Sequence, residues 1–127
     1  MLPQRYRLRR RSDVLRVRRL GKAWRHPLAV LLVVQAQTRM AGEPELSTAQ
    51  PTRFAFTAGR HVGPAVARNR AKRLLREAVH ERLREIEPGW DCLFIVRDLT
   101  PGADYTAVQK AVSNLLRRSG LLEPISG

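Results

Sequence analysis

The segment from Val62 to Val79, VGPAVARNRAKRLLREAV, places a dense block of cations on one predicted helix. Residues 60–76 hold six arginines and lysines and no carboxylate. At about 100° per residue, one arc of this helix carries Arg68, Asn69, Lys72, Arg73 and Arg76. Arg70 falls outside that arc. Like charges four residues apart mildly destabilise a helix, so this stripe predicts a binding surface rather than an ordinary solvated face.

The residue types in the stripe suit an RNA partner. A guanidinium group binds phosphate through two parallel hydrogen bonds and also stacks on bases. The amide of Asn69 both donates and accepts, so it can contact a base edge or a 2′-hydroxyl group. The opposite arc of the helix is apolar: Ala67, Ala71, Leu74, Leu75 and Ala78. We therefore expect a helix that packs on a sheet through one face and binds a polyanion through the other.

The charge of the whole chain also favours a polyanion. The 127 residues carry a formal net charge of +13, and the pI is about 11.6. Besides the stripe, the excess lies in residues 1–26, which hold ten arginines and lysines against one carboxylate. Such a charge destabilises a compact chain unless anions screen it. The length fits a single domain spanning residues 1–127.

Apolar patterning predicts an α+β sandwich in the order helix, two or three strands, helix, strand, helix, with the helices mainly covering one face of an open sheet. Ser12 suits the N-cap of the first helix, and Gly21 suits its end. Residues 1–11 before it are expected to form a flexible basic arm. Trp24 lies in a short extended piece.

Two apolar runs, residues 28–36 and 53–58, read as strands. They flank a polar segment, residues 38–52, that is expected to be a loop. An antiparallel hairpin around this loop is the simplest pairing of the two strands.

The second half of the chain continues with a helix, a strand and a helix. The basic helix should run from about Ala65 to Glu87 and end at Pro88-Gly89. The run WDCLFIVRD, residues 90–98, predicts a strand. An amphipathic helix is expected from Tyr105 to Arg118, followed by a loose tail at residues 120–127.

The string ARNRAKRLLREA resembles the signature of the bacterial ribonuclease P protein family, in which Arg-Asn-Arg is followed by a basic helix. RYRLRRRSDV, from Arg5 to Val14, is similar to the basic opening of that family, and RHVGPAV and GWDCLFIVRD keep its order and spacing. The resemblance covers about Arg5 to Arg118. It implies an α–β sandwich with a left-handed βαβ crossover, a fold shared with a domain of a small-subunit ribosomal protein. The general rule for such crossovers predicts the opposite hand.

The resemblance also implies a role as an accessory subunit. The family's protein forms a 1:1 complex with a large catalytic RNA, and together they remove the 5′ leader of precursor tRNA by endonucleolytic cleavage. The RNA mainly holds the Mg²⁺ ions, so neither a catalytic side chain nor a metal ligand is expected in this polypeptide. The resemblance places eight residues against the catalytic RNA: Arg60, His61, Arg68, Asn69, Arg70, Lys72, Arg73 and Arg76.

A cleft between the first helix and the sheet would receive the single-stranded leader. The residues expected there are Arg9, Arg10, Arg11, Arg16, Arg18 and Trp24. Val14 and Arg18 stand where the first helix of the family often carries aromatics. A strand aromatic is also replaced, near Ala29 or Leu32, and Pro64 stands where asparagine is common. Trp24, or the charge on the first helix, is expected to compensate.

Other residues capable of chemistry lack partners at a useful spacing. The three histidines are scattered and have no metal-ligand pattern. Cys92 is the only cysteine and lies in an apolar run, so it is expected in the core. Asp91 and Asp98 flank a strand, where capping or solvation is a simpler role than binding magnesium.

The N-terminus lacks an apolar signal region, and the longest apolar run, Leu28 to Val34, is too short to cross a membrane. A cytoplasmic protein that binds neither membrane nor DNA is therefore expected. The alternative function is a structural, ribosomal-type RNA-binding protein without a catalytic partner. A DNA-binding module is disfavoured because no helix-turn-helix pair is evident.

Overall fold

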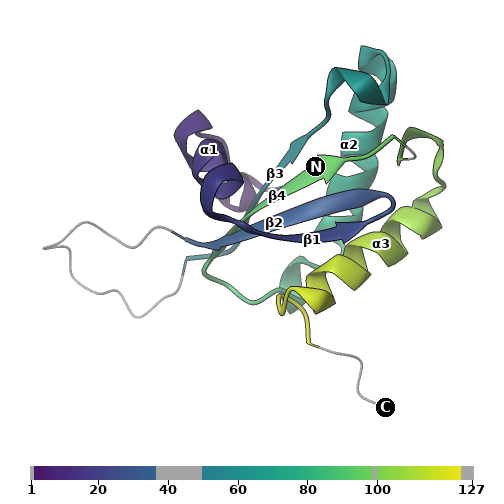
Figure 1. The fold of residues 1–127 in the computed structure, drawn as a ribbon. Coiled ribbons are helices and arrows are strands. Elements are labelled where there is room, and N and C mark those ends of the chain that lie inside the picture. The colour runs from purple at the N-terminus through teal and green to yellow at the C-terminus, as the bar shows by residue number, and fades with distance from the viewer. Residues whose placement is uncertain (1, 37–49, 99, 124–127) are drawn as a thin grey trace, which may run out of the picture.

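The computed structural model describes residues 2–36, 50–98 and 100–123, and within these ranges the chain forms one mixed four-stranded sheet with three α-helices (Figure 1). The helices are α1 (Arg11–Leu20), α2 (Ala65–His80) and α3 (Tyr105–Arg118). The strands are β1 (Lys22–His26), β2 (Ala29–Gln35), β3 (Arg53–Thr57) and β4 (Trp90–Val96). The predicted α+β order is confirmed.

The strand order is β1-β2-β4-β3. β2 pairs antiparallel with both β1 and β4, whereas β3 pairs parallel with β4. The predicted hairpin between residues 28–36 and 53–58 is therefore wrong, because β4 lies between these two strands. Both runs are apolar enough for several positions in a sheet, so the pattern within each run does not determine which strand it pairs with. The unit β3–α2–β4 is the βαβ unit that the resemblance implies, and its hand stays a prediction.

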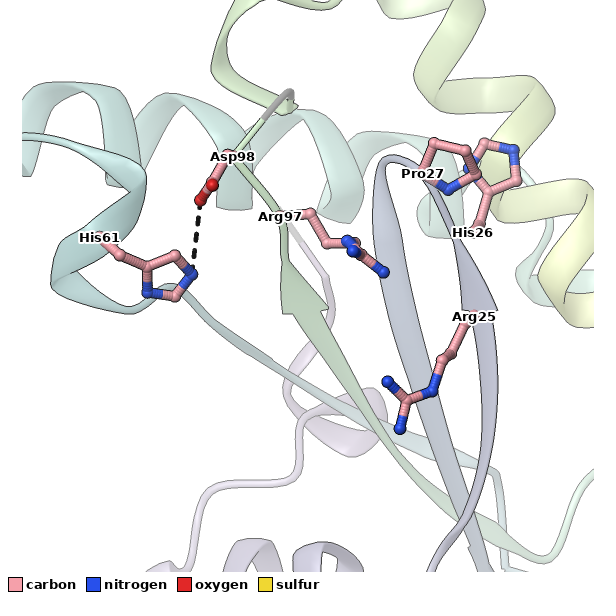
Figure 2. A pocket seen from close by; sticks show the side chains of 6 residues that line it. All are labelled: Arg25, His26, Pro27, His61, Arg97 and Asp98. Carbon is pink, nitrogen blue, oxygen red and sulfur yellow. Dashed lines mark ion pairs between the residues drawn. The ribbon is translucent and has the colours of Figure 1, made fainter.

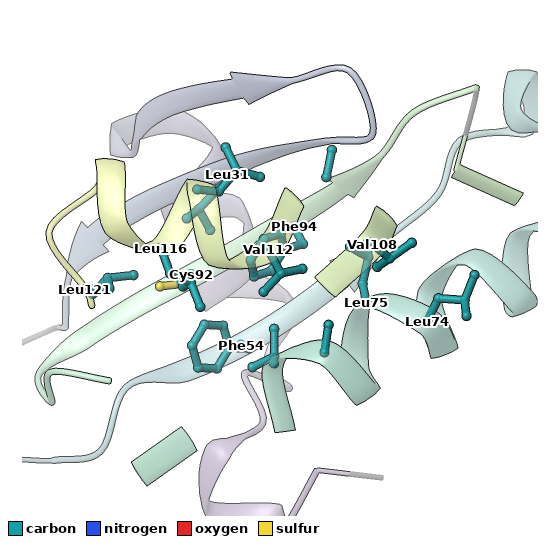
Figure 3. Packing of buried hydrophobic residues seen from close by; sticks show 14 of the residues in the cluster. Leu31, Phe54, Leu74, Leu75, Cys92, Phe94, Val108, Val112, Leu116 and Leu121 are labelled. Carbon is teal, nitrogen blue, oxygen red and sulfur yellow. The ribbon is translucent and has the colours of Figure 1, made fainter. Parts of the chain in front are cut away.

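α2 and α3 cover one face of the sheet and enclose the main core (Figures 1 and 3). Alternate strand residues such as Leu31, Phe54 and Phe94 point into this layer and are buried. The Phe94 ring stacks on Phe54 at 6.2 Å and on Phe56 at 5.7 Å between centroids. Cys92 is buried among them, as predicted. Burial raises the pKa of the Cys92 thiol well above its ordinary value, which keeps it in the unreactive protonated form.

α1 packs alone on the opposite face of the sheet (Figure 1). Its anchor is Val17, which is fully buried against Leu8 and Leu93 in a smaller cluster. α1 begins at Arg11 rather than after the predicted cap Ser12, and its N-cap residue Arg10 makes no side-chain capping bond. The helix is thus held by packing on the sheet rather than by a cap.

α2 ends at His80, seven residues before the predicted end at Glu87. A 3-10 turn, η3 (Leu83–Glu85), follows it. Leu83 and Ile86 pack against the main core there. The helical apolar period continues through this segment, so the sequence alone favours a longer helix, but the tighter turn brings both side chains back to the core.

The N-terminal segment packs on β3 and is not a loose arm. Leu2 and Leu8 are 1% and 5% exposed. The Leu8 amide donates to the Phe54 carbonyl at 2.9 Å, and Arg7 Nε donates to the Leu2 carbonyl at 2.7 Å. Burial of these two leucines, together with the two hydrogen bonds, holds the arginine-rich segment against β3.

The predicted C-terminal tail also starts too early. Leu121 and Leu122 are buried in the main core at 1% and 3% exposure. Most of the predicted loop at residues 38–52 lies outside the described residues, as do residues 124–127. In the described part of the chain, no helix combines the length and the hydropathy that crossing a bilayer requires.

Candidate nucleic-acid interface

The positively charged side chains of α2 form a basic face. They are exposed or half-buried, together with the amide between them: Arg68, Asn69, Arg70, Lys72, Arg73 and Arg76. Across the described residues, none of these five cations forms an ion pair with a carboxylate. The predicted core face is buried at Ala71, Leu74 and Leu75, whereas Ala67 is only half-buried. The basic face is therefore open to an external anion.

The start of α2 is set by a glycine–proline pair. Gly63 has φ of +140°, a conformation that side-chain-bearing residues rarely adopt. Pro64 follows as the N-cap residue, and its carbonyl accepts the amide hydrogen of Arg68 at 3.0 Å. The sharp turn joins α2 to the 3-10 helix η2 (Arg60–Val62). It places the exposed residues Arg60 and His61 at the beginning of the basic face.

Two arginines of the basic face contact neighbouring parts of the molecule. Arg70 Nε donates to the Pro101 carbonyl at 3.2 Å, which ties α2 to the segment after β4. The Arg76 guanidinium lies 6.0 Å from the centroid of the Phe56 ring on β3, within reach of a cation–π interaction. Arg76 thereby connects the basic face with a neighbouring cleft.

This cleft, of about 430 Å³, lies beside β3 between the N-terminal segment and α2. Its lining residues are Leu2, Arg7, Leu8, Arg9, Val14, Phe54, Ala55, Phe56, Thr57, Arg76 and Leu93. Most of these side chains are apolar, and the charged ones are all arginines. An apolar surface with cationic groups suits single-stranded nucleic acid, because bases stack on the former and phosphates pair with the latter.

The structure brings the predicted leader residues together only in part. Arg9 lines the cleft. Arg10 and Arg11 are exposed at the start of α1, and Arg18 is exposed further along it. Val14, which the resemblance places at a position where the family often has an aromatic, also lines the cleft. The cleft therefore has an aliphatic side chain at this position.

Trp24 packs on the face of the sheet opposite to α1. It pairs with Leu31, and both pack with the main core under α3. Lys22 Nζ lies 5.1 Å from the Trp24 ring centroid. The structure does not bring Trp24 together with the residues of α1.

Phe56 is a cleft residue that the sequence analysis missed. It is half-buried and lies two positions after Phe54 on β3, which is an edge strand. The period of two in RFAFT predicts that the two rings share a face. That β3 lies at the edge could not be predicted while it was expected to pair with β2.

Arg16, another predicted leader residue, is engaged inside the molecule. Its guanidinium pairs with the carboxylate of Asp91, which is fully buried. Arg53 binds the same carboxylate with two hydrogen bonds of 3.1 Å. Asp13 lies 3.7 Å from Arg16 and 3.8 Å from Arg53. This four-residue cluster joins α1 to β3 and β4.

The expectation that Asp91 caps or is solvated is wrong, because a buried carboxylate requires charged partners. The sequence did offer one sign that Asp91 is buried, because this carboxylate directly precedes the apolar run CLFIV. In the described ranges, no three His, Cys, Asp or Glu side chains gather closely enough to hold a metal ion.

Comparison with known proteins gives one family. A family model described as Ribonuclease P matches residues 2–120. The chain is 40% identical over 115 residues to the ribonuclease P protein component of Herpetosiphon aurantiacus, covering 91% of this chain and 85% of that protein. It is 38% identical over 120 residues to the corresponding protein of Chloroflexus aurantiacus, covering 92% and 79%.

Solved structures give the same result for the fold. The RNase P protein from Thermotoga maritima matches with a TM-score of 0.71 and 26% identity, over 95% of this chain and 98% of that one. The RNase P protein of Staphylococcus aureus matches with a TM-score of 0.74 over 93% and 98%. The latter pair is only 19% identical, so it supports the fold alone.

Proposed function

The chain belongs to the family of ribonuclease P protein components, and we propose that it binds the catalytic RNA through α2 and the precursor-tRNA leader through the cleft beside β3. Membership makes it the RNA-binding subunit of a ribonucleoprotein endoribonuclease that acts on precursor tRNA. The alternative of a structural RNA-binding protein is not favoured, because the named relatives match over nearly the whole chain.

The observation that carries the proposal is the unpaired basic face of α2. Five cations on one helix without an ion-paired carboxylate among the described residues repel one another in the free protein. RNA phosphates would relieve that repulsion and release counterions. The proposed contacts to the catalytic RNA are Arg60, His61, Arg68, Asn69, Arg70, Lys72 and Arg73.

The cleft is the proposed path of the leader. Arg7 and Arg9 on the N-terminal segment and Arg76 on α2 would pair with phosphates, while Phe56 offers a ring to a base. Arg10, Arg11 and Arg18 would extend the positive field along α1. In this proposal Arg16 positions α1 through Asp91, and Trp24 takes no part.

The polypeptide would act by holding the two RNAs in a productive arrangement. Its cations neutralise phosphates that otherwise repel, so less free Mg²⁺ is needed for assembly. Mg²⁺ held mainly by the partner RNA would supply the hydrolytic chemistry. Contact with the leader favours precursor over mature tRNA, and precise placement of the scissile bond is itself a catalytic contribution. We expect one protein per RNA, acting in the cytoplasm.

The test is cleavage of a precursor tRNA by a bacterial ribonuclease P RNA at low magnesium, with and without the protein. The expected result is strong stimulation with cleavage at the mature 5′ end. Tight RNA binding without any stimulation of cleavage would contradict the proposal. It would instead favour a structural RNA-binding protein.

A further inference from the structure

A second hollow, of about 640 Å³, lies at the end of the sheet where β1 and β4 finish (Figure 2). It is lined by Arg25, His26, Pro27, His61, Arg97 and Asp98. Only His61 among these belongs to the proposed RNA contacts. The hollow is therefore largely a separate feature.

The sheet register explains why these distant residues meet. His26 at the end of β1 pairs with Ala29 at the start of β2, and Ala29 pairs with Val96 at the end of β4. β3 runs parallel to β4 and leads directly into η2. Three segments far apart in sequence thus reach the same end of the sheet: residues 25–27, residue 61 and residues 97–98.

Hydrogen bonds fix the backbones that carry the two arginines. The buried Thr100 hydroxyl accepts the Arg97 amide hydrogen at 3.2 Å and donates to the Leu28 carbonyl. The Arg118 guanidinium donates to the Arg25 carbonyl at 2.7 Å. The hollow is therefore a built feature of the fold rather than an accidental gap between loops.

The charges in the hollow favour an anion. Arg25 and Arg97 are exposed, and neither side chain forms an ion pair within the described residues. Figure 2 shows Arg97 between the His61–Asp98 pair and the hairpin that carries Arg25. His61 Nε2 lies 3.5 Å from Asp98 Oδ1. Asp98 is the one carboxylate among the residues that line the hollow, and it makes this contact with His61, so both guanidinium groups remain available.

We propose that this hollow binds a phosphate group of an RNA backbone, with Arg25 and Arg97 as its ligands. The inference rests on the proposed function and adds a contact to it. Two guanidinium groups present the planar donor pairs that phosphate oxygens prefer. η2 supplies both His61 here and the approach to α2, so the basic surface continues from α2 across the end of the sheet.

The test is the double variant Arg25→Ala/Arg97→Ala, assayed for binding to ribonuclease P RNA over a series of salt concentrations. The matched control is Arg84→Ala/Lys110→Ala, which removes two exposed cations elsewhere. We expect several-fold weaker binding for the first variant only, with the slope of log K against log salt lower by about one. Asp98→Asn should tighten binding, because it removes a negative charge beside the phosphate.

A second measurement separates the two possible sources of the phosphate. The affinity of the assembled ribonucleoprotein is measured for precursor tRNAs with long and short leaders. If the leader supplies the phosphate, the double variant loses affinity only for the long leader and binds the RNA subunit normally. If the RNA subunit supplies it, direct binding weakens and the two leaders respond alike. Either result supports the site.

The inference is overturned if the double variant matches its control in both measurements. It is also overturned if inorganic phosphate raises the melting temperature of the wild type but not of the double variant, while both RNA measurements stay unchanged. That result would indicate a site for a free anion. Arg73→Ala is assayed in parallel. If Arg73→Ala weakens RNA binding while the double variant of the hollow matches its control in both measurements, only this inference fails. A wild type that does not stimulate cleavage contradicts the proposed function itself.

Discussion

At the scale of single residues, Arg73 is the clearest probe of the basic face. It is exposed, and across the described part of the chain its side chain forms no ion pair. Arg73→Ala should therefore leave the melting temperature nearly unchanged. It should weaken binding to ribonuclease P RNA and lower the salt slope by about one.

Arg84→Ala is the matched control, because Arg84 is also exposed but lies in η3, beyond the end of α2. It should bind RNA almost as the wild type does. Equal RNA affinities for Arg73→Ala and Arg84→Ala would contradict the proposal that α2 contacts the RNA.

Tyr105 offers a second residue-scale prediction. Burial, and then the hydrogen bond of its hydroxyl to Glu81 at 2.8 Å, raise the pKa of Tyr105 to about 12. The unfolded chain would ionise near pH 10. Because the folded protein holds the phenol proton more tightly than the unfolded chain does, Tyr105 contributes to the free energy of unfolding. This contribution is complete below about pH 10 and is lost as the pH rises from 10 towards 12.

Ultraviolet absorbance of the phenolate should show one of the two tyrosines titrating near pH 12 in the folded protein. Tyr105→Phe should abolish that step and reduce the loss of stability between pH 10 and 12. A titration near pH 10 that Tyr105→Phe abolishes would contradict the raised pKa.

At the scale of elements, the attachment of α1 depends on Asp91. Asp91→Asn keeps the shape of the side chain but removes the charge that binds Arg16 and Arg53. We expect a loss of about 2–3 kcal/mol in the free energy of unfolding, somewhat below the range for breaking a fully buried pair, because both arginines are partly exposed. Denaturant unfolding measures it.

Asp98→Asn at the other end of β4 is the control. The Asp98 side chain is 73% exposed, so its substitution should change the unfolding free energy very little. If Asp91→Asn were equally mild, the ion-pair cluster would not hold α1. Because Val14 of α1 lines the cleft, Asp91→Asn should also lower affinity for long-leader precursors more than affinity for the RNA subunit.

Elements with a strong local pattern were predictable from the sequence. α3 begins and ends where the apolar period places it, and α2 begins at Ala65 as Pro64 indicates. The basic face of α2 followed from the same periodicity. These features depend on residues within one or two turns of each other.

The features that could not be predicted from the sequence depend on residues that are far apart in the chain. The sequence does not show that β4 separates β2 from β3, so the edge position of Phe56 was also hidden. Asp91 and Arg16 are 75 residues apart, and no local signal links them. The hollow at Arg25 and Arg97 likewise exists only because the strand register brings two ordinary arginines together.

At the scale of the whole molecule, the net charge of +13 predicts a stability that depends on ionic strength. The described residues form few ion pairs compared with the number of cations, so most positive charges repel one another. Sodium chloride screens this repulsion over a Debye length of about 10 Å at 0.1 M. The melting temperature should rise as salt is added.

Calorimetry across a sodium chloride series checks this, with a neutral osmolyte of equal osmolality as the control. A melting temperature that is flat or falls with salt would show that self-repulsion is unimportant. The same salt that stabilises the free protein should weaken its complex with RNA, so the two curves should have opposite slopes.

The inner position of β4 has a consequence for the order of folding. β1 and β2 are neighbours in sequence and can pair soon after both exist, but β3 has no strand partner until residues 90–96 arrive. Closing so long a loop is slow, because its entropy is lost before the contacts form. During synthesis, α2 would therefore emerge from the ribosome before its sheet is complete. A nascent chain stopped before Trp90 should remain sensitive to protease, and one extended through α3 should become resistant in a single step.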